Sequence, residues 1–440
     1  MYLSTSRAAD IAADTPPRGG PVRAVPGTVL ALGLVSLVTD VSAEMVTAVL
    51  PLYLVAGLGM SPLAFGALDG LQHGATALLR LLGGRVADRT RRRKPVAGAG
   101  YALSAACKAA LLVVTTPWSV AAVLAADRTG KGLRTAPRDA LISLSCAAGE
   151  QGRAFGVHRA MDTTGALLGP LAAFGVLSVA ADGYAAVFTV SCCFAVLGVV
   201  LLVLFVREAP APPDQPARPD RPSPPDHPSP PAASTAPAAA PGRSVRSLLR
   251  LPALRRLCLT AAVLGVFTVG DAFLYLLLQR RLGLPLAWFP LLPVGTAAVF
   301  LLAAVPAGRF ADRLGRRRVF LGGHLLLLGA CLLLLAPLPA GPALAFAGVA
   351  VVGLLGLFYA STDGVLMAAA APLLPAGLRT TGLAVLQTAQ ALARFAGSLL
   401  FGAAWTLWGP GAALAAAACG LLAALAAASA FGGPEAGGAT

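Results

Sequence analysis

Apolar stretches of about 20 residues recur along the whole chain and are separated by short polar turns. At a rise of about 1.5 Å per residue, a helix of this length crosses the roughly 30 Å hydrocarbon core of a bilayer. The pattern predicts twelve such helices, at residues 27–55, 63–84, 95–115, 118–141, 155–177, 184–206, 257–279, 286–307, 319–337, 342–366, 380–404 and 409–431. We therefore expect an all-α membrane protein with twelve transmembrane helices.

These predicted helices fall into two groups of six, separated by a proline-rich stretch of low complexity that cannot bury an apolar core. We expect two pseudo-symmetric six-helix bundles joined by a cytoplasmic tether. The expected parts are a disordered cytoplasmic tail at 1–26, a first bundle at 27–206, a linker with a basic interfacial segment at 207–256, a second bundle at 257–431 and a tail at 432–440.

Composition agrees with a membrane protein, because 57% of the residues are hydrophobic and only 12% are charged, with a mean hydropathy of +0.76. A water-soluble domain carries about 25% charged residues. The net charge of +15 comes from basic clusters in alternate loops, at 85–94, 243–256 and 309–318, and not from a surface patch of the kind that binds nucleic acid. The positive-inside bias then places these loops and both termini in the cytoplasm, with Arg280 and Arg281 as exceptions.

An internal repeat supports the division into two halves. The sequence GRVADRTRRRK at 84–94 returns as GRFADRLGRRR at 308–318, which is 224 residues later. Asp139 and Asp363, near the inner ends of the fourth and tenth predicted helices, are separated by the same 224 residues. A repeat that sets a basic loop between two apolar helices in each half is typical of secondary transporters.

These motifs resemble the major facilitator superfamily (MFS) over nearly the whole chain outside the tail and linker. Residues 308–318 match the family's loop between helices 2 and 3 in full, whereas Arg91 replaces a glycine in the first copy. Leu124, Arg128 and Gly132 are similar to the family's arginine motif in helix 4. The resemblance implies a bacterial inner-membrane protein with two six-helix bundles that alternate access.

The fifth predicted helix resembles a motif associated with proton-coupled exporters. The matching positions are Gly156, Gly165, Gly169 and Pro170. Glycines at four-residue spacing let a neighbouring helix approach closely, so packing explains them whatever the function. The resemblance adds that such packing seals the path between the bundles against leakage in antiporters.

The repeated loops suggest a gate, on the basis of the same resemblance. It implies that Asp88 caps the neighbouring helix and that Arg92 reaches Asp139 when the transporter faces outward. The corresponding residues of the second half are Asp312, Arg316 and Asp363. We predict that the Arg92–Asp139 and Arg316–Asp363 pairs come within salt-bridge reach in the outward-facing state.

Charged residues within the apolar helices are the candidates for proton coupling, because each costs about 2.5–3.5 kcal/mol to insert at the centre of a span. Asp40 and Glu44 lie at i, i+4 near the middle of the first helix, so we expect both to face a central cavity. Repulsion between two carboxylates away from water favours protonation of one of them. Alternatively, both are fixed in ion pairs with Arg80, Lys108 or Arg128.

Two further helices contribute to the candidate proton site. Asp69 and His73 share one stripe of the second helix with Arg80; His73 is either a proton relay or a neutral hydrogen-bonding residue. Arg128 cannot give up its proton at ordinary pH and is expected to hold an acid in its charged form. A second stripe of the fourth helix, formed by Asp127, Lys131, Arg134 and Arg138, is expected either to reach lipid phosphate or to line a vestibule.

Polar residues of the second half are sparse, which suits a cavity wall that recognises a substrate with few hydrogen bonds. The candidate substrate-binding residues are Asp162, Asp271, Tyr275, Gln387, Gln390 and Arg394. Asp271 and Arg394 could instead pair with each other in a structural role.

No phosphate-cradling loop, HExxH or GxSxG motif is present, and no cysteine spacing suggests a metal site, so we expect neither an enzyme nor a cofactor. The sequence favours a monomeric secondary transporter whose partners are protons, the lipid bilayer and a small-molecule substrate. We expect proton-coupled efflux of a small amphipathic or cationic molecule. The alternatives are uptake of a metabolite by symport or facilitated diffusion, and a non-transporting receptor or scaffold that uses the proline-rich linker.

Overall fold

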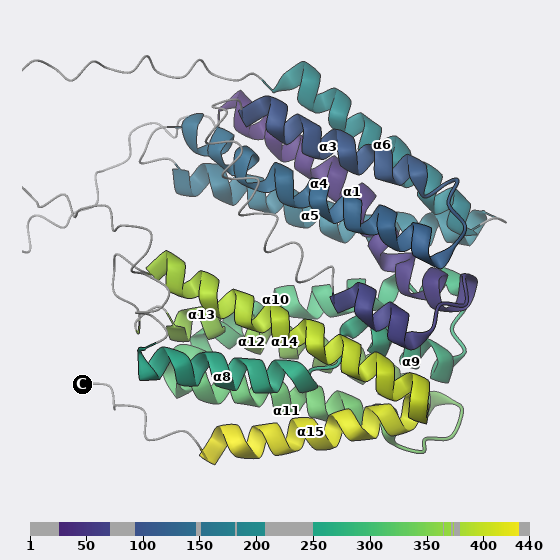
Figure 1. Cartoon of the computed structure of the whole chain (residues 1–440), viewed down its shortest axis with the longest axis vertical. Coiled ribbons are helices and arrows are strands. Elements are labelled where there is room, and N and C mark those ends of the chain that lie inside the picture. Colours follow the sequence, from purple (N-terminus) through teal and green to yellow (C-terminus); the bar gives the residue numbers. More distant parts are fainter. Residues whose placement is uncertain are drawn as a thin grey trace, which may run out of the picture.

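The structure is a computed structural model that describes residues 26–70, 93–146, 151–180, 183–206, 250–363, 365–370, 373 and 379–430. Within these ranges every regular element is a helix. The helices form two bundles, which Figure 1 shows one above the other, as the twelve-helix prediction requires.

The first bundle contains α1 (Gly27–Leu52), which continues as a π-helical turn η1 (Tyr53–Gly57), and a helix over residues 62–70. It is completed by α3 (Arg93–Ala110), α4 (Pro117–Leu144), α5 (Gln151–Val179) and α6 (Gly183–Phe205). The start of α4 follows from its sequence: Thr116 accepts a hydrogen bond from the Ser119 N–H, and Pro117 occupies the first helical position, where no N–H is needed.

The second bundle contains α8 (Pro252–Phe267), α9 (Asp271–Leu282), the 3-10 turn η2 (Leu286–Trp288) and α10 (Leu291–Leu314). It continues with α11 (Arg316–Leu335), α12 (Pro342–Thr362), α13 (Val365–Ala370), α14 (Arg379–Trp408) and α15 (Pro410–Ala430).

The predicted seventh helix, 257–279, is not continuous, and this is a correction. It divides into α8 and α9 at Thr268, Val269 and Gly270, and a hydropathy pattern hides the break because these three residues carry no charge and no proline. Gly270 is extended at the N-cap of α9, and a Cβ added to it would lie 3.2 Å from Asp69 Oδ2 of the other bundle. The break therefore places the start of α9 beside a carboxylate at the interface between the bundles.

Eight helices of the described ranges are long and apolar enough to cross a membrane, and α4 is not among them. The reason is charge, since α4 carries six charged residues: Asp127, Arg128, Lys131, Arg134, Arg138 and Asp139. A helix of this kind has to place most of its charges toward other helices and not toward lipid.

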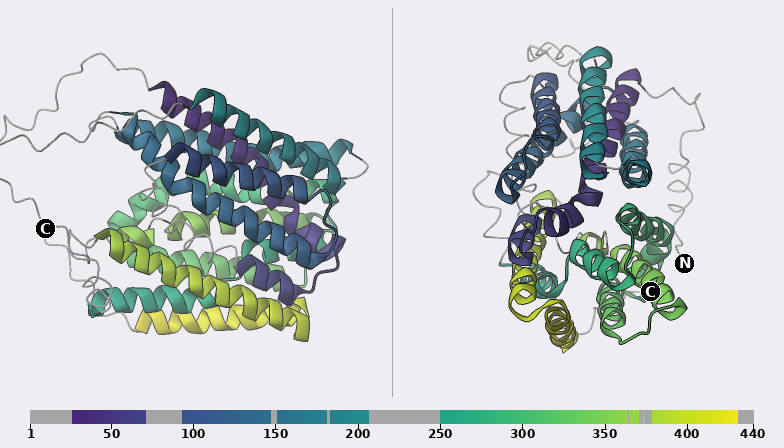
Figure 2. Two further views of the ribbon diagram at one scale, coloured as in Figure 1. Left: turned by 45° about the horizontal axis from the view of Figure 1, so that its top comes forward. Right: turned by 90° about the vertical axis from the view of Figure 1, so that its right-hand side faces the viewer.

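The two bundles meet at the end of the molecule that carries the uncharged turns. Phe174 of α5 stacks edge-on against Trp288 with ring centroids 6.3 Å apart, and the Leu63 N–H donates to Thr406 Oγ1 over 3.1 Å. The helix over 62–70 lies beside α14 there (Figure 2), and a Cβ on Gly402 would collide with the backbone of Pro62. At the opposite end, where α1 begins and α6 ends, the two bundles diverge (Figure 1).

Arg280 and Arg281, the exceptions to the charge alternation, both have partners within the protein. The Arg281 guanidinium donates to the carbonyl oxygens of Leu334 and Ala336 at the end of α11. The Arg280 guanidinium lies over the Trp405 ring, 5.3 Å from its centroid. These two arginines therefore stabilise the ends of α11 and α14 where the bundles meet. Their charge is not a guide to the orientation of the protein in the membrane.

Candidate functional site

A cavity of about 540 Å³ lies between the two bundles. Its wall is apolar over much of its area, with Phe65, Phe289 and three prolines among the lining residues. The polar side chains at the wall come from both bundles and are Glu44, Thr47, Asp69, Arg128, Lys131, Asp271, Tyr275 and Gln387. An apolar wall with a few convergent charged groups is the usual make-up of a site for a small organic molecule.

Six of the residues predicted for coupling or substrate binding lie at this cavity. They are Glu44, Asp69, Arg128, Asp271, Tyr275 and Gln387. Sequence reasoning did not assign Thr47, Lys131, Phe65 or Phe289 to the cavity. Lys131 was recognised as part of a charged stripe, but only the packing of α4 against α1 turns that stripe inward.

Gln390 and Arg394 are not at this cavity, contrary to the prediction. They line a separate void just large enough for water inside the second bundle, together with Thr268 and His324. The reason is the close approach of α14 to α8, where a Cβ on Gly265 would lie 3.0 Å from the Ala393 Cβ. Among the described residues no ion pair joins Asp271 to Arg394, so the alternative structural pairing of these two is also absent.

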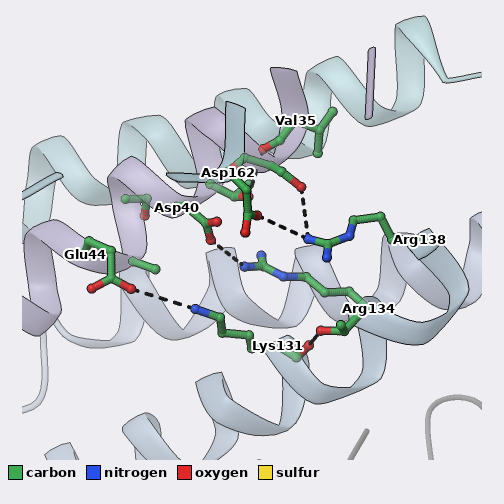
Figure 3. A network of polar contacts seen from close by, with 12 residues as sticks. Val35, Asp40, Glu44, Lys131, Arg134, Arg138 and Asp162 are labelled. Carbon is green, nitrogen blue, oxygen red and sulfur yellow. Dashed lines mark hydrogen bonds and ion pairs between the residues drawn. The ribbon is translucent and has the colours of Figure 1, made fainter. Parts of the chain in front are cut away.

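Asp162 was predicted to bind substrate, and the structure instead places it in a network of charges inside the first bundle (Figure 3). The network joins acids of α1 and α5 to three bases of α4. Arg134 Nη2 lies 3.6 Å from Asp40 Oδ1, and Arg138 Nη1 lies 3.5 Å from Asp162 Oδ1. This network begins at the cavity, where Lys131 Nζ lies 3.8 Å from Glu44 Oε1.

The geometry of the two helices explains the network. Lys131, Arg134 and Arg138 follow at i, i+3 and i+7 and so share one face of α4. Asp40 and Glu44 share one face of α1, and the two faces oppose each other in Figure 3. The stripe predicted to reach lipid phosphate or a vestibule therefore serves mainly to neutralise the acids of α1.

The expected partners of these acids were wrong where the structure describes them. Lys108 pairs with Asp127 over 2.9 Å, and the Arg128 guanidinium donates to Thr47 Oγ1 over 3.3 Å. Arg80 lies outside the described residues, as do His73, Asp88 and Arg92. Of the pair Asp40 and Glu44, only Glu44 lies at the cavity; Asp40 is 7% exposed and lies deeper in the bundle.

Asp69 connects the two bundles. Its carboxylate accepts a hydrogen bond from Ser398 Oγ of α14 over 2.8 Å. The same oxygen lies beside Gly270, at the N-cap of α9, where a carboxylate is favoured by the helix dipole. A negative charge of the first bundle is thus held by the second bundle at the rim of the cavity.

The predicted gate residues of the second half are not arranged as the outward-facing prediction requires. The Arg316 guanidinium donates to the Ala368 carbonyl over 2.6 Å and lies 3.4 Å from Asp312, while Asp363 is exposed at the end of α12. Asp139 pairs with Arg138 over 3.0 Å. All of these residues lie at the end where the bundles diverge, so the gate prediction applies to a conformation other than this one.

The glycines of α5 divide into two groups. At Gly165 a Cβ would collide with the Leu37 carbonyl of α1, and at Gly169 it would lie 2.7 Å from the Glu44 Cβ. At Gly156 a Cβ would meet no described atom within 4 Å, so the close packing predicted for that glycine is not found. Pro170 lies within α5 and lines the cavity.

Comparisons with known proteins agree with this architecture. The sequence profile of the Major Facilitator Superfamily matches residues 32–301, and that of the sugar (and other) transporters matches residues 244–437. Since the first match covers more than half of the chain, the protein belongs to the major facilitator superfamily. It is therefore a multi-pass membrane protein of the MFS type.

Curated relatives match less of the chain. An uncharacterised MFS-type transporter of Methanocaldococcus jannaschii is 35% identical over 184 residues, which are 41% of this chain and 45% of the relative. An uncharacterised protein of Mycobacterium tuberculosis is 33% identical over 184 residues, 42% of this chain and 45% of the relative. The match thus spans about 45% of the length of these relatives.

Solved structures share the fold at low sequence identity. The nucleoside transporter NupG has a TM-score of 0.70 at 14% identity and covers 92% of this chain and 98% of its own. The peptide transporter POT in complex with sulfate has a TM-score of 0.68 at 17% identity, with coverage of 96% and 98%. The two transporters handle different classes of molecule on one fold, so the fold alone does not select a substrate.

Proposed function

We propose that this transporter exchanges protons for a small amphipathic or cationic molecule and exports that molecule by alternating access. The observation that carries the proposal is the cavity between the bundles together with the buried carboxyl group of Asp40 on α1 behind it. A cavity alone suits any transporter. Ionisable groups buried at the core of a span, which are costly to insert, add the means to couple transport to protons.

The preference for a cationic or amphipathic molecule comes from the cavity wall. Three carboxylates (Glu44, Asp69 and Asp271) and two basic groups (Arg128 and Lys131) line the cavity, and most of the other lining residues are apolar. Among the described residues Asp271 has no ion-pair partner, so its charge is available to a cation. The aromatic rings of Phe65 and Phe289 supply apolar contact for the rest of such a molecule.

The topology proposed from the basic loops places the diverging ends of the bundles in the cytoplasm. The conformation described here then corresponds to an inward-facing transporter that takes its cargo from the cytoplasm. Protons that flow inward along a membrane potential supply about 2.3 kcal/mol per 100 mV, plus the pH difference. In the outward-facing state the Arg92–Asp139 and Arg316–Asp363 pairs would close the cytoplasmic side.

The test uses the full chain reconstituted in liposomes that contain a pH-sensitive dye. Gradients of ethidium, uridine and dialanine are imposed in turn, as an amphipathic cation, a nucleoside and a peptide. The proposal expects proton movement opposite to ethidium that is lost in Glu44→Gln and kept in Asp220→Asn, an acid of the proline-rich linker that belongs to no proposed site. Proton movement in the same direction as uridine or dialanine would establish uptake instead, and movement with none of the three would contradict the proposal.

A further inference from the structure

The break between α8 and α9 creates a helix N-terminus within an apolar segment of membrane-spanning length. Gly270, the residue that precedes α9, has no side chain with which to cap this helix. Instead, Oδ2 of Asp69 in the first bundle lies 3.2 Å from the position that a Cβ of Gly270 would take. The partial positive charge of a helix N-terminus favours a carboxylate at this place.

A second group of the same bundle holds this carboxylate. Ser398 of α14, which is 5% exposed, donates a hydrogen bond from its hydroxyl group to Asp69 Oδ2 over 2.8 Å. Ser398 Oγ also lies 3.6 Å from the Cβ position of Gly270, so Asp69, Ser398 and Gly270 meet at one point. A hydrogen bond to a charged acceptor is about twice as strong as one between neutral groups. The contact therefore ties a charge of one bundle to two helices of the other.

Two glycines place the helix that carries Asp69 directly on the backbone of α14. A Cβ on Gly66 would collide with the Ser398 carbonyl oxygen. A Cβ on Gly70 would lie 3.0 Å from the Phe395 carbonyl oxygen, one turn earlier on α14. Asp69 follows Gly66 by three residues and so lies on the same side of its helix. This packing brings the carboxylate to Ser398, and it exists only while the two bundles touch.

We propose that Asp69, Ser398 and Gly270 form a latch that holds the bundles together at the end where they meet, and that the charge of Asp69 gives the latch its strength. Apolar contacts lie beside it, such as that of Phe65 with Phe273, whose ring centroids are 5.1 Å apart. The latch adds a contact that is specific to this conformation. Loss of the charge or of its donor therefore shifts the protein toward a state in which this end is open. The inference requires neither proton coupling nor a particular cargo.

The surroundings of Asp69 allow the latch to open. Asp69 is half-buried and lines the cavity between the bundles. Water in the cavity can therefore hydrate the carboxylate once Ser398 and Gly270 move away. A carboxylate enclosed on all sides would be left unpaired when its partners leave, which is far more costly. The latch can thus stabilise one conformation without preventing the exchange between two.

Hydrogen–deuterium exchange of the full chain in lipid nanodiscs, measured by mass spectrometry without cargo, tests the latch. Separation of the bundles lets water reach the helices at their contact, so the backbone amides of residues 62–70 and 398–408 serve as reporters. Asp69→Asn removes the charge at constant size, and Ser398→Ala removes the donor; each is expected to speed exchange of the reporters roughly tenfold. Gly270→Ala should act in the same direction, because its methyl group displaces the carboxylate while the extended backbone at this residue accepts alanine.

Two controls separate the latch from a general loss of structure. Thr406→Val removes another hydrogen bond between the bundles, the one from the Leu63 N–H, which is exposed and joins neutral groups. The reporters are expected to keep the wild-type rate in this variant, because water replaces such a bond when it breaks. The helices α6 and α15, which Figure 1 shows at the outer sides of the two bundles, should keep the wild-type rate in every variant, since the bundles separate without unfolding.

Wild-type exchange of the reporters in Asp69→Asn would overturn the latch, as would exchange in Thr406→Val as fast as in Ser398→Ala. If Asp69→Asn also speeds exchange in α6 and α15, that variant has lost its fold, and Ser398→Ala and Gly270→Ala decide the question: reporters at the wild-type rate in both contradict the proposal. The result is independent of the liposome assay. Faster exchange of the reporters without proton movement would refute the proposed function and leave the latch intact, whereas proton movement with unaffected reporters would do the reverse.

Discussion

The two bundles share a fold but differ in what fills their interiors. Positions related by the spacing of 224 residues show this on α4 and α12: Lys131, Arg134 and Arg138 correspond to Leu355, Phe358 and Thr362. Arg134 is paired with Asp40, whereas the Phe358 ring packs against His324 with centroids 5.3 Å apart. Duplicated helices thus keep their packing while one copy carries ion pairs and the other aromatic contacts.

The comparison suggests a division of work between the halves. Titratable groups gather within the first bundle, next to and behind the cavity. At the cavity the second bundle contributes Asp271, Tyr275 and Gln387, and the Tyr275 hydroxyl donates a hydrogen bond to Thr296 Oγ1 over 2.9 Å. Proton handling by one half and substrate recognition by the other would let the rocking of the bundles couple the two.

Removal of one partner of a buried ion pair should have the largest effect. Arg134→Leu leaves Asp40 without its closest base, and breaking a buried pair costs about 3–5 kcal/mol. Phe358→Leu, at the corresponding position of the second bundle, should cost less, about 1.5 kcal/mol or below, because leucine keeps most of the apolar contact. Thermal unfolding in detergent measures both variants. Equal losses of stability in the two variants would show that the buried charges of the first bundle contribute no more than the aromatic packing of the second.

Loss of the Asp271 carboxylate at the cavity should come next. Asp271→Asn removes a charge–charge contact with a bound cation, and a hydrogen bond to a charged group contributes about 1.5–3 kcal/mol. The Kd for ethidium, measured by fluorescence, should rise by roughly ten- to a hundredfold. Gln387→Asn, which shortens a neutral lining residue by one methylene, serves as the control. An unchanged Kd in Asp271→Asn would show that the second bundle does not recognise the cation through this carboxylate.

The packing of α5 on α1 should be sensitive at Gly165 and insensitive at Gly156. Gly165→Ala forces a Cβ onto the Leu37 carbonyl, and such overpacking costs about 1–3 kcal/mol. Gly156→Ala finds open space and should leave the protein as stable as wild type or stabilise it slightly, since alanine favours a helix over glycine. Unfolding midpoints in detergent compare the two. The opposite order would mean that α5 does not approach α1 as described.

Charge reversal at the end where the bundles diverge should have the smallest effect on stability. Arg316→Glu removes an exposed pair with Asp312 that is worth under about 1 kcal/mol and a hydrogen bond to the Ala368 carbonyl that is worth about 0.5–1.5 kcal/mol. If Arg316 and Asp363 meet in the outward-facing state, Arg316→Glu should slow transport in liposomes, and the added change Asp363→Arg should restore part of it. If the double variant transports no faster than Arg316→Glu alone, the proposed gate is contradicted.

Much of the fold could be predicted from the sequence, because the length of an apolar stretch and the thickness of a bilayer are linked directly. The break at 268–270 could not, since Thr268, Val269 and Gly270 are uncharged and include no proline that would signal the end of a helix. At the candidate site, the chemistry of Asp40, Glu44 and Asp271 could be singled out, because a charge inside a span is rare. Their partners could not, because pairing depends on which faces of α1, α4 and α5 meet.

The sequence by itself determined the class of the protein. It shows helices of membrane-spanning length, duplicated in two halves, with acidic residues inside some of the apolar stretches. The tertiary structure alone decided that Asp40 pairs with Arg134 and Asp162 with Arg138 while Glu44 turns to the cavity, and that Arg394 lies inside its own bundle. The physical reason is that hydrophobicity and charge are properties of single residues. An ion pair or a cavity wall is a property of distances between helices, which here depend on close contacts such as those at Gly165 and Gly265.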